Sequence, residues 1–204
     1  KPLNPDCQLI VFARSDDYFL GALHSRIHEV WALQQCTFLE DRPRYTPTTC
    51  FRTFPFPWPP GEEDQQDPSV QAVAEAAQKL CEQRQNWLYP DEYTETETLE
   101  FPASADGPWA RYVEDAGEDG TGTARYERTV VDPPFEDAMK KKTLTNLYNR
   151  MPTWLENAHE KLDEAVFNAY AEATGDPAWS PDMSDEDILE KLLELNLERA
   201  AEES

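Results

Sequence analysis

Arginine and hydroxyl side chains gather in the first third of the chain. Side chains of these types are the usual donors to phosphates and base edges in nucleic-acid complexes. The sequence therefore predicts a nucleic-acid contact here, although spacing alone would equally suit ordinary surface arginines. The candidate contact residues, all between positions 14 and 52, are Arg14, Ser25, Arg26, His28, Arg42, Arg44, Tyr45, Thr48 and Thr49.

The distribution of charge supports the same location. Residues 1–60 contain six basic and six acidic residues, whereas residues 61–204 contain twelve basic and thirty-five acidic residues and account for the whole net charge of −23. A strongly negative surface repels a polyanion. We therefore expect any nucleic-acid contact to come from the first third, and we interpret the acidic remainder as a solvated shell.

Two further motifs could carry chemistry. His24 and His28 lie four residues apart and could share a metal ion, but no third ligand stands at a recognisable spacing, so we predict no metal site. Residues 132–135 read Asp-Pro-Pro-Phe, the pattern that holds a flipped adenine in N6 methyltransferases. The chain lacks a glycine-rich loop for the methyl donor, so we interpret this motif as a turn and expect no binding of S-adenosylmethionine.

Residues 45–61, which we call the aromatic–proline segment, begin inside the candidate region and extend beyond it. Phe54, Phe56 and Trp58 alternate with prolines, and proline excludes a helix or a central strand. Aromatic side chains of this size are costly to leave in water. We predict an extended segment that lies in a groove and is anchored by these three aromatic residues; a Pro-x-x-Pro ligand at 57–60 is the minority alternative.

The surrounding elements follow from periodicity and capping signals. We predict a strand at 8–14 and a single helix from a Ser15 cap to about Gln35, followed by a loop. Further helices are predicted from Pro68 to about Tyr89, within 140–150, from Pro152 to Gly175, and after a Ser184 cap. Within 91–139, two alternating runs predict strands of a hairpin-like arm around an acidic turn. The predicted fold class is α+β, mostly α.

Composition sets the remaining limits. Cys7, Cys36, Cys50 and Cys81 form no Cys-x-x-Cys pair, and their spacing favours reduced thiols in a cytoplasmic protein. No apolar run is long enough to span a membrane, so no membrane contact is expected. The first residue is not methionine, and we expect the chain to be a piece of a longer protein.

Three long stretches resemble one family. Residues 23–33 (LHSRIHEVWAL), 44–61 (RYTPTTCFRTFPFPWPPG) and 140–171 are similar to the C-terminal part of MmeI-like class I adenine-N6 DNA methyltransferases of restriction–modification and phage-defence systems. The resemblance covers most of the chain and is weakest at 91–139, which looks like an insertion. Arg52 stands where the family pattern has glutamate.

The resemblance implies a domain organisation. Residues 1–61 would be the end of a target-recognition domain, 62–90 a helix of the C-terminal domain, 91–139 an inserted acidic arm and 140–204 the helical C-terminal domain. The partners would be double-stranded DNA and the catalytic methyltransferase domain of the same parent protein. Catalytic residues and the S-adenosylmethionine site would lie in the parent, so neither catalysis nor a cofactor is expected of this chain. The alternatives are an acidic docking domain and a DNA-mimicking protein.

Overall fold

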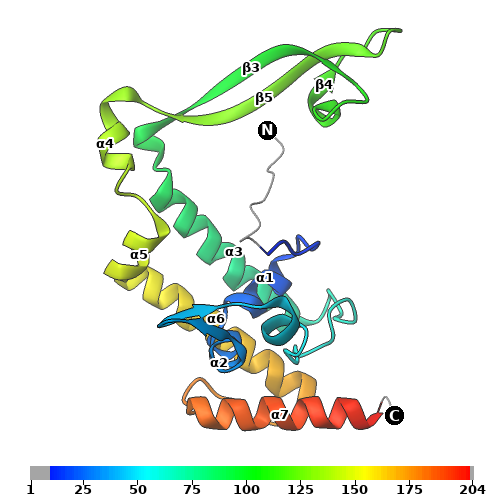
Figure 1. Cartoon of the computed structure of the whole chain (residues 1–204), viewed down its shortest axis with the longest axis vertical. Coiled ribbons are helices and arrows are strands. Elements are labelled where there is room, and N and C mark those ends of the chain that lie inside the picture. Colours follow the sequence, from blue (N-terminus) through cyan, green and yellow to red (C-terminus); the bar gives the residue numbers. More distant parts are fainter. Residues whose placement is uncertain (1–9, 203–204) are drawn as a thin grey trace. The chain divides into compact units, whose positions relative to one another are not determined.

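The computed structural model describes residues 10–202 (Figure 1). Helices make up most of it, and its strands form two small antiparallel sheets, so the predicted α+β, mostly α fold class is confirmed. The chain divides into two compact units. Within the described residues, one unit comprises residues 84–150, and the other comprises residues 10–83 and 151–202.

The unit at residues 84–150 contains a three-stranded sheet. Strand β3 (Thr94–Ser104) pairs antiparallel with β5 (Thr121–Val131), which pairs in turn with the short strand β4 (Val113–Glu114). Both strands predicted in this region are therefore present. One face is aromatic, because Phe101 and Tyr126 pack against Trp109. The polar face is held by ion pairs of Arg125 with Glu100 and Glu114.

Short helical elements flank this sheet in the chain. Turn η2 (Asp91–Tyr93) precedes β3 and η3 (Ala110–Tyr112) precedes β4, whereas η4 (Pro133–Phe135), α4 (Glu136–Met139) and α5 (Leu144–Arg150) follow β5. The Asp-Pro-Pro-Phe motif forms a turn here, as predicted: the amide of Phe135 donates to the carbonyl of Asp132, and the amide of Asp132 donates to the carbonyl of Tyr93. The ring of Phe135 stacks on Tyr93 at 4.5 Å between centroids, so the motif's aromatic ring is used within the unit.

The other unit begins with two helices where the sequence predicts one. Helix α1 (Asp17–His24) is capped by Asp16 rather than Ser15, and α2 (Arg26–Gln35) follows after a break at Ser25. Ser25 adopts an extended backbone and its hydroxyl accepts from the amide of His28 while donating to the carbonyl of Ala22. A serine hydroxyl that satisfies both helix ends makes this break stable, and periodicity cannot reveal it because the apolar stripe continues across it.

Three long helices agree with the sequence-based predictions. Helix α3 (Pro68–Leu88) follows the Asp67 cap, α6 (Thr153–Thr174) follows Pro152, and α7 (Asp185–Glu202) follows Ser184. Gly175 ends α6 with φ of +66°, a left-handed conformation that glycine adopts without strain. Their buried side chains repeat every three or four residues, including Val70, Val73, Ala77 and Leu80 on α3.

Two local elements differ from the predictions. The predicted strand at 8–14 is wrong for the described residues 10–14, which form no strand; residues 8 and 9 lie outside the described part. The ring of Phe12 instead packs on Phe19 and Phe51, so contacts with side chains replace a strand partner. The predicted loop after α2 is in fact a hairpin of β1 (Thr37–Leu39) and β2 (Arg42–Arg44), followed by the π-helical turn η1 (Pro47–Phe51).

Helix α1 packs closely against α3 and α6 at Gly21. A Cβ atom at Gly21 would lie 2.7 Å from Val73 Cγ1, 3.1 Å from Ala77 Cβ and 3.2 Å from Leu162 Cδ1. The absence of a side chain therefore sets how near the first helix comes to the long helices.

Candidate nucleic-acid interface

The hairpin β1–β2 presents two of the predicted arginines to solvent. Arg44 pairs with Thr37 and Arg42 pairs with Leu39, so both arginines lie on the same face of the hairpin. Both residues are exposed, and no carboxylate among residues 10–202 forms an ion pair with either guanidinium. In a chain with so many carboxylates, two unpaired arginines on one face are available for an external anion.

The turn η1, which comes shortly after the hairpin in the chain, carries exposed hydroxyl groups. Thr48 and Thr49 are exposed, and the hydroxyl of Thr49 lies 2.6 Å from that of Thr46. The buried thiol of Cys50 anchors this turn, because its Sγ donates to the carbonyl of Ala32 in α2. We define the hairpin surface as the exposed side chains of Arg42, Arg44, Thr48 and Thr49. It combines four of the predicted contact residues.

His28 and Tyr45 lie behind the hairpin surface. His28 is 4% exposed, and its Nε2 lies 3.0 Å from the hydroxyl of Tyr45. Burial, together with the nearby His24, lowers the pKa of His28 to about 4, and burial raises the pKa of Tyr45 to about 12. Because His28 Nδ1 is buried with no partner in the described part of the chain, the tautomer with hydrogen on Nε2 costs least, since it leaves only a lone pair unpaired. Because Tyr45 directly follows β2, its contact with the buried His28 ties the end of that strand to the core.

Arg26 makes internal contacts rather than joining the hairpin surface. Its guanidinium donates to the carbonyls of Pro181 and Met183 and forms a 2.7 Å ion pair with Asp185 at the start of α7. Its backbone amide donates to Asp163 Oδ1 at 2.7 Å, and burial raises the pKa of that carboxyl group. Ser25, beside it, is 1% exposed and serves as the cap between α1 and α2.

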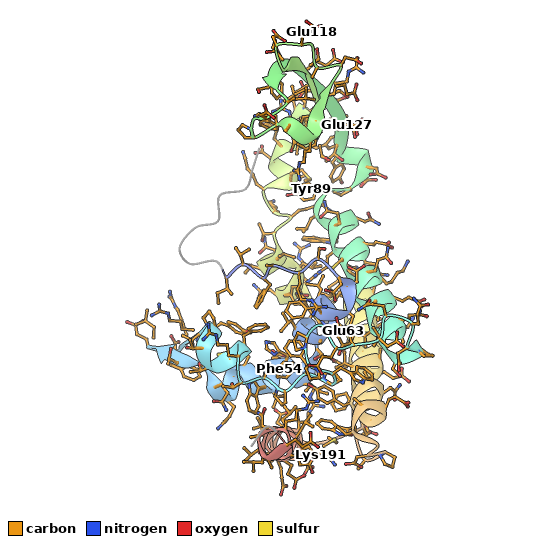
Figure 2. The ribbon with its side chains drawn as sticks, turned by 90° about the vertical axis from the view of Figure 1, so that its right-hand side faces the viewer. Phe54, Glu63, Tyr89, Glu118, Glu127 and Lys191 are labelled. Carbon is orange, nitrogen blue, oxygen red and sulfur yellow. The ribbon has the colours of Figure 1, made fainter. Side chains whose placement is uncertain are left out.

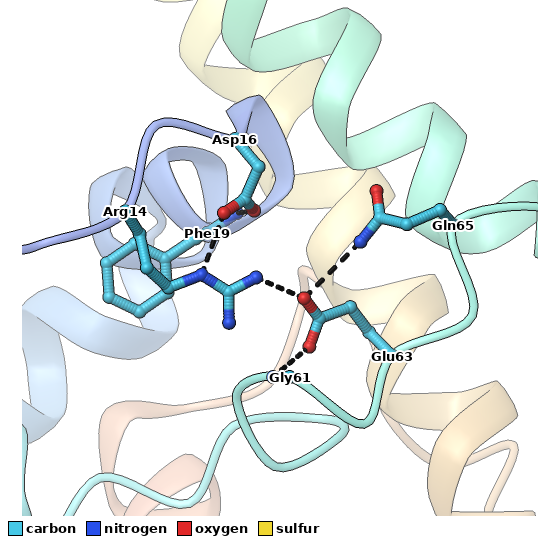
Figure 3. Close-up of polar contacts among 6 residues, drawn as sticks. All are labelled: Arg14, Asp16, Phe19, Gly61, Glu63 and Gln65. Atoms are coloured by element: carbon cyan, nitrogen blue, oxygen red, sulfur yellow. Dashed lines mark hydrogen bonds and ion pairs between the residues drawn. The ribbon is translucent and has the colours of Figure 1, made fainter.

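Arg14 is likewise held internally (Figure 3). Its guanidinium forms ion pairs with Asp16 and with Glu63, whose side chain is 2% exposed. The second oxygen of Glu63 accepts from the amide of Gly61, and Gln65 Nε2 donates to the first. Burial opposes ionisation of Glu63, but hydrogen bonds from Arg14 and from the amides of Glu63 and Gly61, with the charge of Arg14, lower the pKa of its carboxyl group. The network ties the start of α1 to the loop that leads into α3.

We expect Arg14→Met to lower the free energy of unfolding by about 1–2 kcal/mol, because it leaves the buried carboxylate of Glu63 without its cation while two other donors remain. Urea unfolding at pH 7 measures the effect. The matched control is Arg52→Met, because Arg52 is exposed and its side chain forms no ion pair within residues 10–202. Equal midpoints for the two variants would contradict this assignment.

The aromatic–proline segment passes from the hairpin surface into the core. Phe54 is 5% exposed and Phe56 is 3% exposed, whereas Trp58 is partly exposed and contacts Tyr18. Figure 2 shows Phe54 among the side chains of this unit. The ring of Phe54 lies 4.4 Å from His28 and 4.8 Å from Phe56 between centroids.

Backbone carbonyls of the same segment are held by the two last helices. Tyr170 Oη on α6 donates to the carbonyl of Pro55 at 2.7 Å. On α7, Asn196 donates to the carbonyl of Thr53 at 2.9 Å, and Arg199 donates to those of Phe56 and Pro57 at 2.7 Å each. A proline-rich segment cannot pair its carbonyls in a regular ladder, so these side chains supply the missing donors. Sequence reasoning missed Glu63, Tyr170, Asn196 and Arg199, since only the fold brings them to their partners.

Other candidate chemistry is sparse in the described part of the chain. Within residues 10–202, no group of three or more metal-binding side chains comes together. Cys36, Cys50 and Cys81 are free thiols, and the prediction for Cys7 lies outside the described residues. No helix among the described residues is long and apolar enough to cross a membrane.

Comparison with known proteins gives one structural similarity. No family model matches the sequence, and no curated protein matches it. A solved structure, that of the type IIL restriction–modification enzyme MmeI in complex with DNA, is similar over 92% of this chain with a TM-score of 0.51 and 19% sequence identity. The chain spans 17% of the length of that protein. This is a likeness of fold.

Proposed function

We propose that this chain is a DNA-recognition and positioning part of an adenine-N6 DNA methyltransferase of a restriction–modification or phage-defence system. The observation that carries the proposal is the pair of unpaired arginines, Arg42 and Arg44, on one face of an exposed hairpin in a chain of net charge −23. The fold likeness to a restriction–modification enzyme in complex with DNA supports it.

In this proposal the hairpin surface contacts the sugar–phosphate backbone of a duplex. Arginine donates to phosphate oxygens in a forked geometry, and threonine hydroxyls add single hydrogen bonds. The core then fixes the position of the hairpin through the contact of His28 with Tyr45 and through the buried rings of Phe54 and Phe56. The role of this chain would be to present the target adenine. The site for the methyl donor S-adenosylmethionine and the catalytic residues would lie in the rest of the parent protein.

The test uses the intact parent enzyme and duplexes carrying its target site at several salt concentrations. Each lost phosphate contact lowers the slope of log affinity against log salt by about one. We therefore expect Arg42→Ala and Arg44→Ala each to lower the slope by about one and to weaken all sequences alike. A base contact would instead relax the preference at one position and cost about 1–3 kcal/mol.

Two variants sharpen the comparison. Arg26→Ala tests the sequence-based prediction for that residue, and its internal bonds lead us to expect a loss of stability rather than a change in the salt slope. Arg111→Ala is the matched control, an exposed arginine in the sheet-containing unit. If neither hairpin variant changes affinity, slope or sequence preference, the DNA assignment of the hairpin surface fails.

A docking domain is the second candidate function. Leu193 is 54% exposed and Leu197 is 62% exposed, four residues apart on α7 and therefore on one side of that helix. Exposed leucines of this kind favour contact with another part of a larger protein. A DNA-independent loss of activity or stability in the parent enzyme carrying Leu193→Lys would favour this role.

A further inference from the structure

The hairpin carries two large apolar side chains that are exposed to solvent. Phe38 is 60% exposed and Leu39 is 70% exposed, and all six residues of β1 and β2 are exposed. In Figure 2 the hairpin, drawn in light blue, extends away from α6. Single exposed apolar residues are common on protein surfaces, but two in succession on a fully exposed strand indicate a contact surface.

The register of the hairpin separates these two side chains. Leu39 pairs with Arg42, and directly opposite side chains lie on the same face with their Cβ atoms about 4.5–5.5 Å apart. Leu39 therefore shares the face of Arg42 and Arg44 and lies next to the turn. Phe38 pairs with Pro43 and lies on the other face. Only Leu39 accompanies the arginines of the hairpin surface.

The shape of the hairpin matches one surface of DNA. The major groove of a B-form duplex admits a two-stranded β-ribbon. The turn residues Glu40 and Asp41 are exposed, and phosphates at the rim of the groove repel their carboxylates. A hairpin that enters turn first places these carboxylates at the floor of the groove and leaves Arg44 near the rim. Arg42 lies beside the turn, and its long side chain reaches back to the phosphates.

An apolar side chain next to the turn meets one complementary group on the floor of that groove. The major-groove edges of adenine, guanine and cytosine present hydrogen-bond donors and acceptors, whereas thymine adds a C5-methyl group. Contact between a leucine and this methyl group removes apolar surface of both from water. A polar base edge in the same place would lose water without gaining a hydrogen-bond partner.

We propose that Leu39 contacts the C5-methyl group of a thymine in the target site and gives the parent enzyme a preference for thymine at that position. This inference rests on the proposed DNA contact of the hairpin surface and adds a base preference to it. A duplex that carries a target adenine contains at least one thymine, the partner of that adenine, so every target site offers a candidate.

The experiment replaces each thymine of the target duplex in turn by deoxyuridine, which removes only the C5-methyl group. Binding to each duplex is measured with the intact parent enzyme. At one position we expect the wild type to bind deoxyuridine about fourfold more weakly than thymine, as loss of one methyl contact predicts. Leu39→Ala should bind both duplexes equally at that position, because its side chain is too short to reach the methyl group.

Two variants serve as controls. Leu39→Met keeps an apolar side chain of similar length, so it should retain the preference for thymine. Phe38→Ala removes an exposed apolar side chain of the same strand from the opposite face, and it should discriminate as the wild type does. Because Leu39 and Phe38 are exposed, all three variants should melt at the wild-type temperature, which shows that the fold is intact.

The outcomes separate this proposal from the proposed function. The thymine contact is overturned if no position responds to loss of the methyl group, or if Leu39→Ala keeps the fourfold difference. It is also overturned if Leu39→Ala weakens binding to both duplexes while the difference remains, which indicates an apolar wedge between base steps. In each case a lower salt slope in Arg42→Ala and Arg44→Ala leaves the DNA contact of the hairpin surface standing. An unchanged slope, affinity and sequence preference in these two variants removes both.

Discussion

Replacing Phe54 by alanine is expected to lower the free energy of unfolding by about 3–5 kcal/mol, the usual range for a buried aromatic residue. Phe54 is 5% exposed, and its ring contacts those of His28, Trp31 and Phe56. Removing it leaves a cavity lined by rigid rings that cannot move in to fill the space. Urea unfolding followed by circular dichroism measures the change.

The control for this substitution is Phe38→Ala. Phe38 lies on β1 of the hairpin and is 60% exposed, so its loss should change the free energy of unfolding by less than about 0.5 kcal/mol. Trp58→Ala should fall between these two, because Trp58 is only partly buried. Unchanged midpoints in both Phe54→Ala and Trp58→Ala would mean that the aromatic–proline segment does not anchor the fold.

The second large effect concerns acidic pH. The pKa of His28 is about 4 in the folded protein against an ordinary value of 6.5. The folded state therefore favours neutral His28. The stability that follows from this preference is fully present above pH 6.5 and is lost as the pH falls towards 4. A difference of about 2.5 pKa units at 1.36 kcal/mol each corresponds to about 3 kcal/mol. The protein should lose that much more stability over this range than His28→Gln does.

Stability measured by urea unfolding at several pH values between 4 and 7 tests this expectation. Carboxyl groups contribute equally to both proteins, so their difference isolates His28. In the comparison variant His24→Gln, His28 stays buried and loses only the smaller contribution of His24 to its lowered pKa, so most of the pH dependence due to His28 should remain. Parallel curves for the wild type and His28→Gln would show that His28 ionises as easily in the folded protein as in the unfolded one.

Local signals were sufficient for the parts of the fold that are stabilised within one element. The caps at Asp67 and Ser184, the glycine at 175 and the three-to-four-residue spacing predicted α3, α6 and α7, because each signal acts within a few residues of the helix it starts or ends. The alternating runs likewise predicted β3 and β5. The strand predicted at 8–14 failed over residues 10–14 because a strand needs a partner, which an apolar run cannot specify.

The candidate site was less accessible to sequence reasoning. Arg14, Arg26 and Arg44 look alike in the sequence, yet the fold pairs the first with Glu63 across 49 positions and the second with Asp185 across 159, and leaves the third exposed. Which arginine is free depends on where distant carboxylates lie.

Strand β3 lies at the edge of its sheet, and its side chains affect whether a further strand could pair with it. Among residues 10–202, the strand order β3–β5–β4 leaves one side of Thr94–Ser104 without a neighbouring strand, and a free edge of eleven residues is a template on which a second copy could add a strand. On this strand Glu97 and Glu100 pair with Arg128 and Arg125 of β5, whereas Glu95 is exposed and forms no ion pair among residues 10–202. Pro102 removes a backbone donor from the same strand. A charged side chain and a proline on an edge strand both disfavour the addition of a further strand.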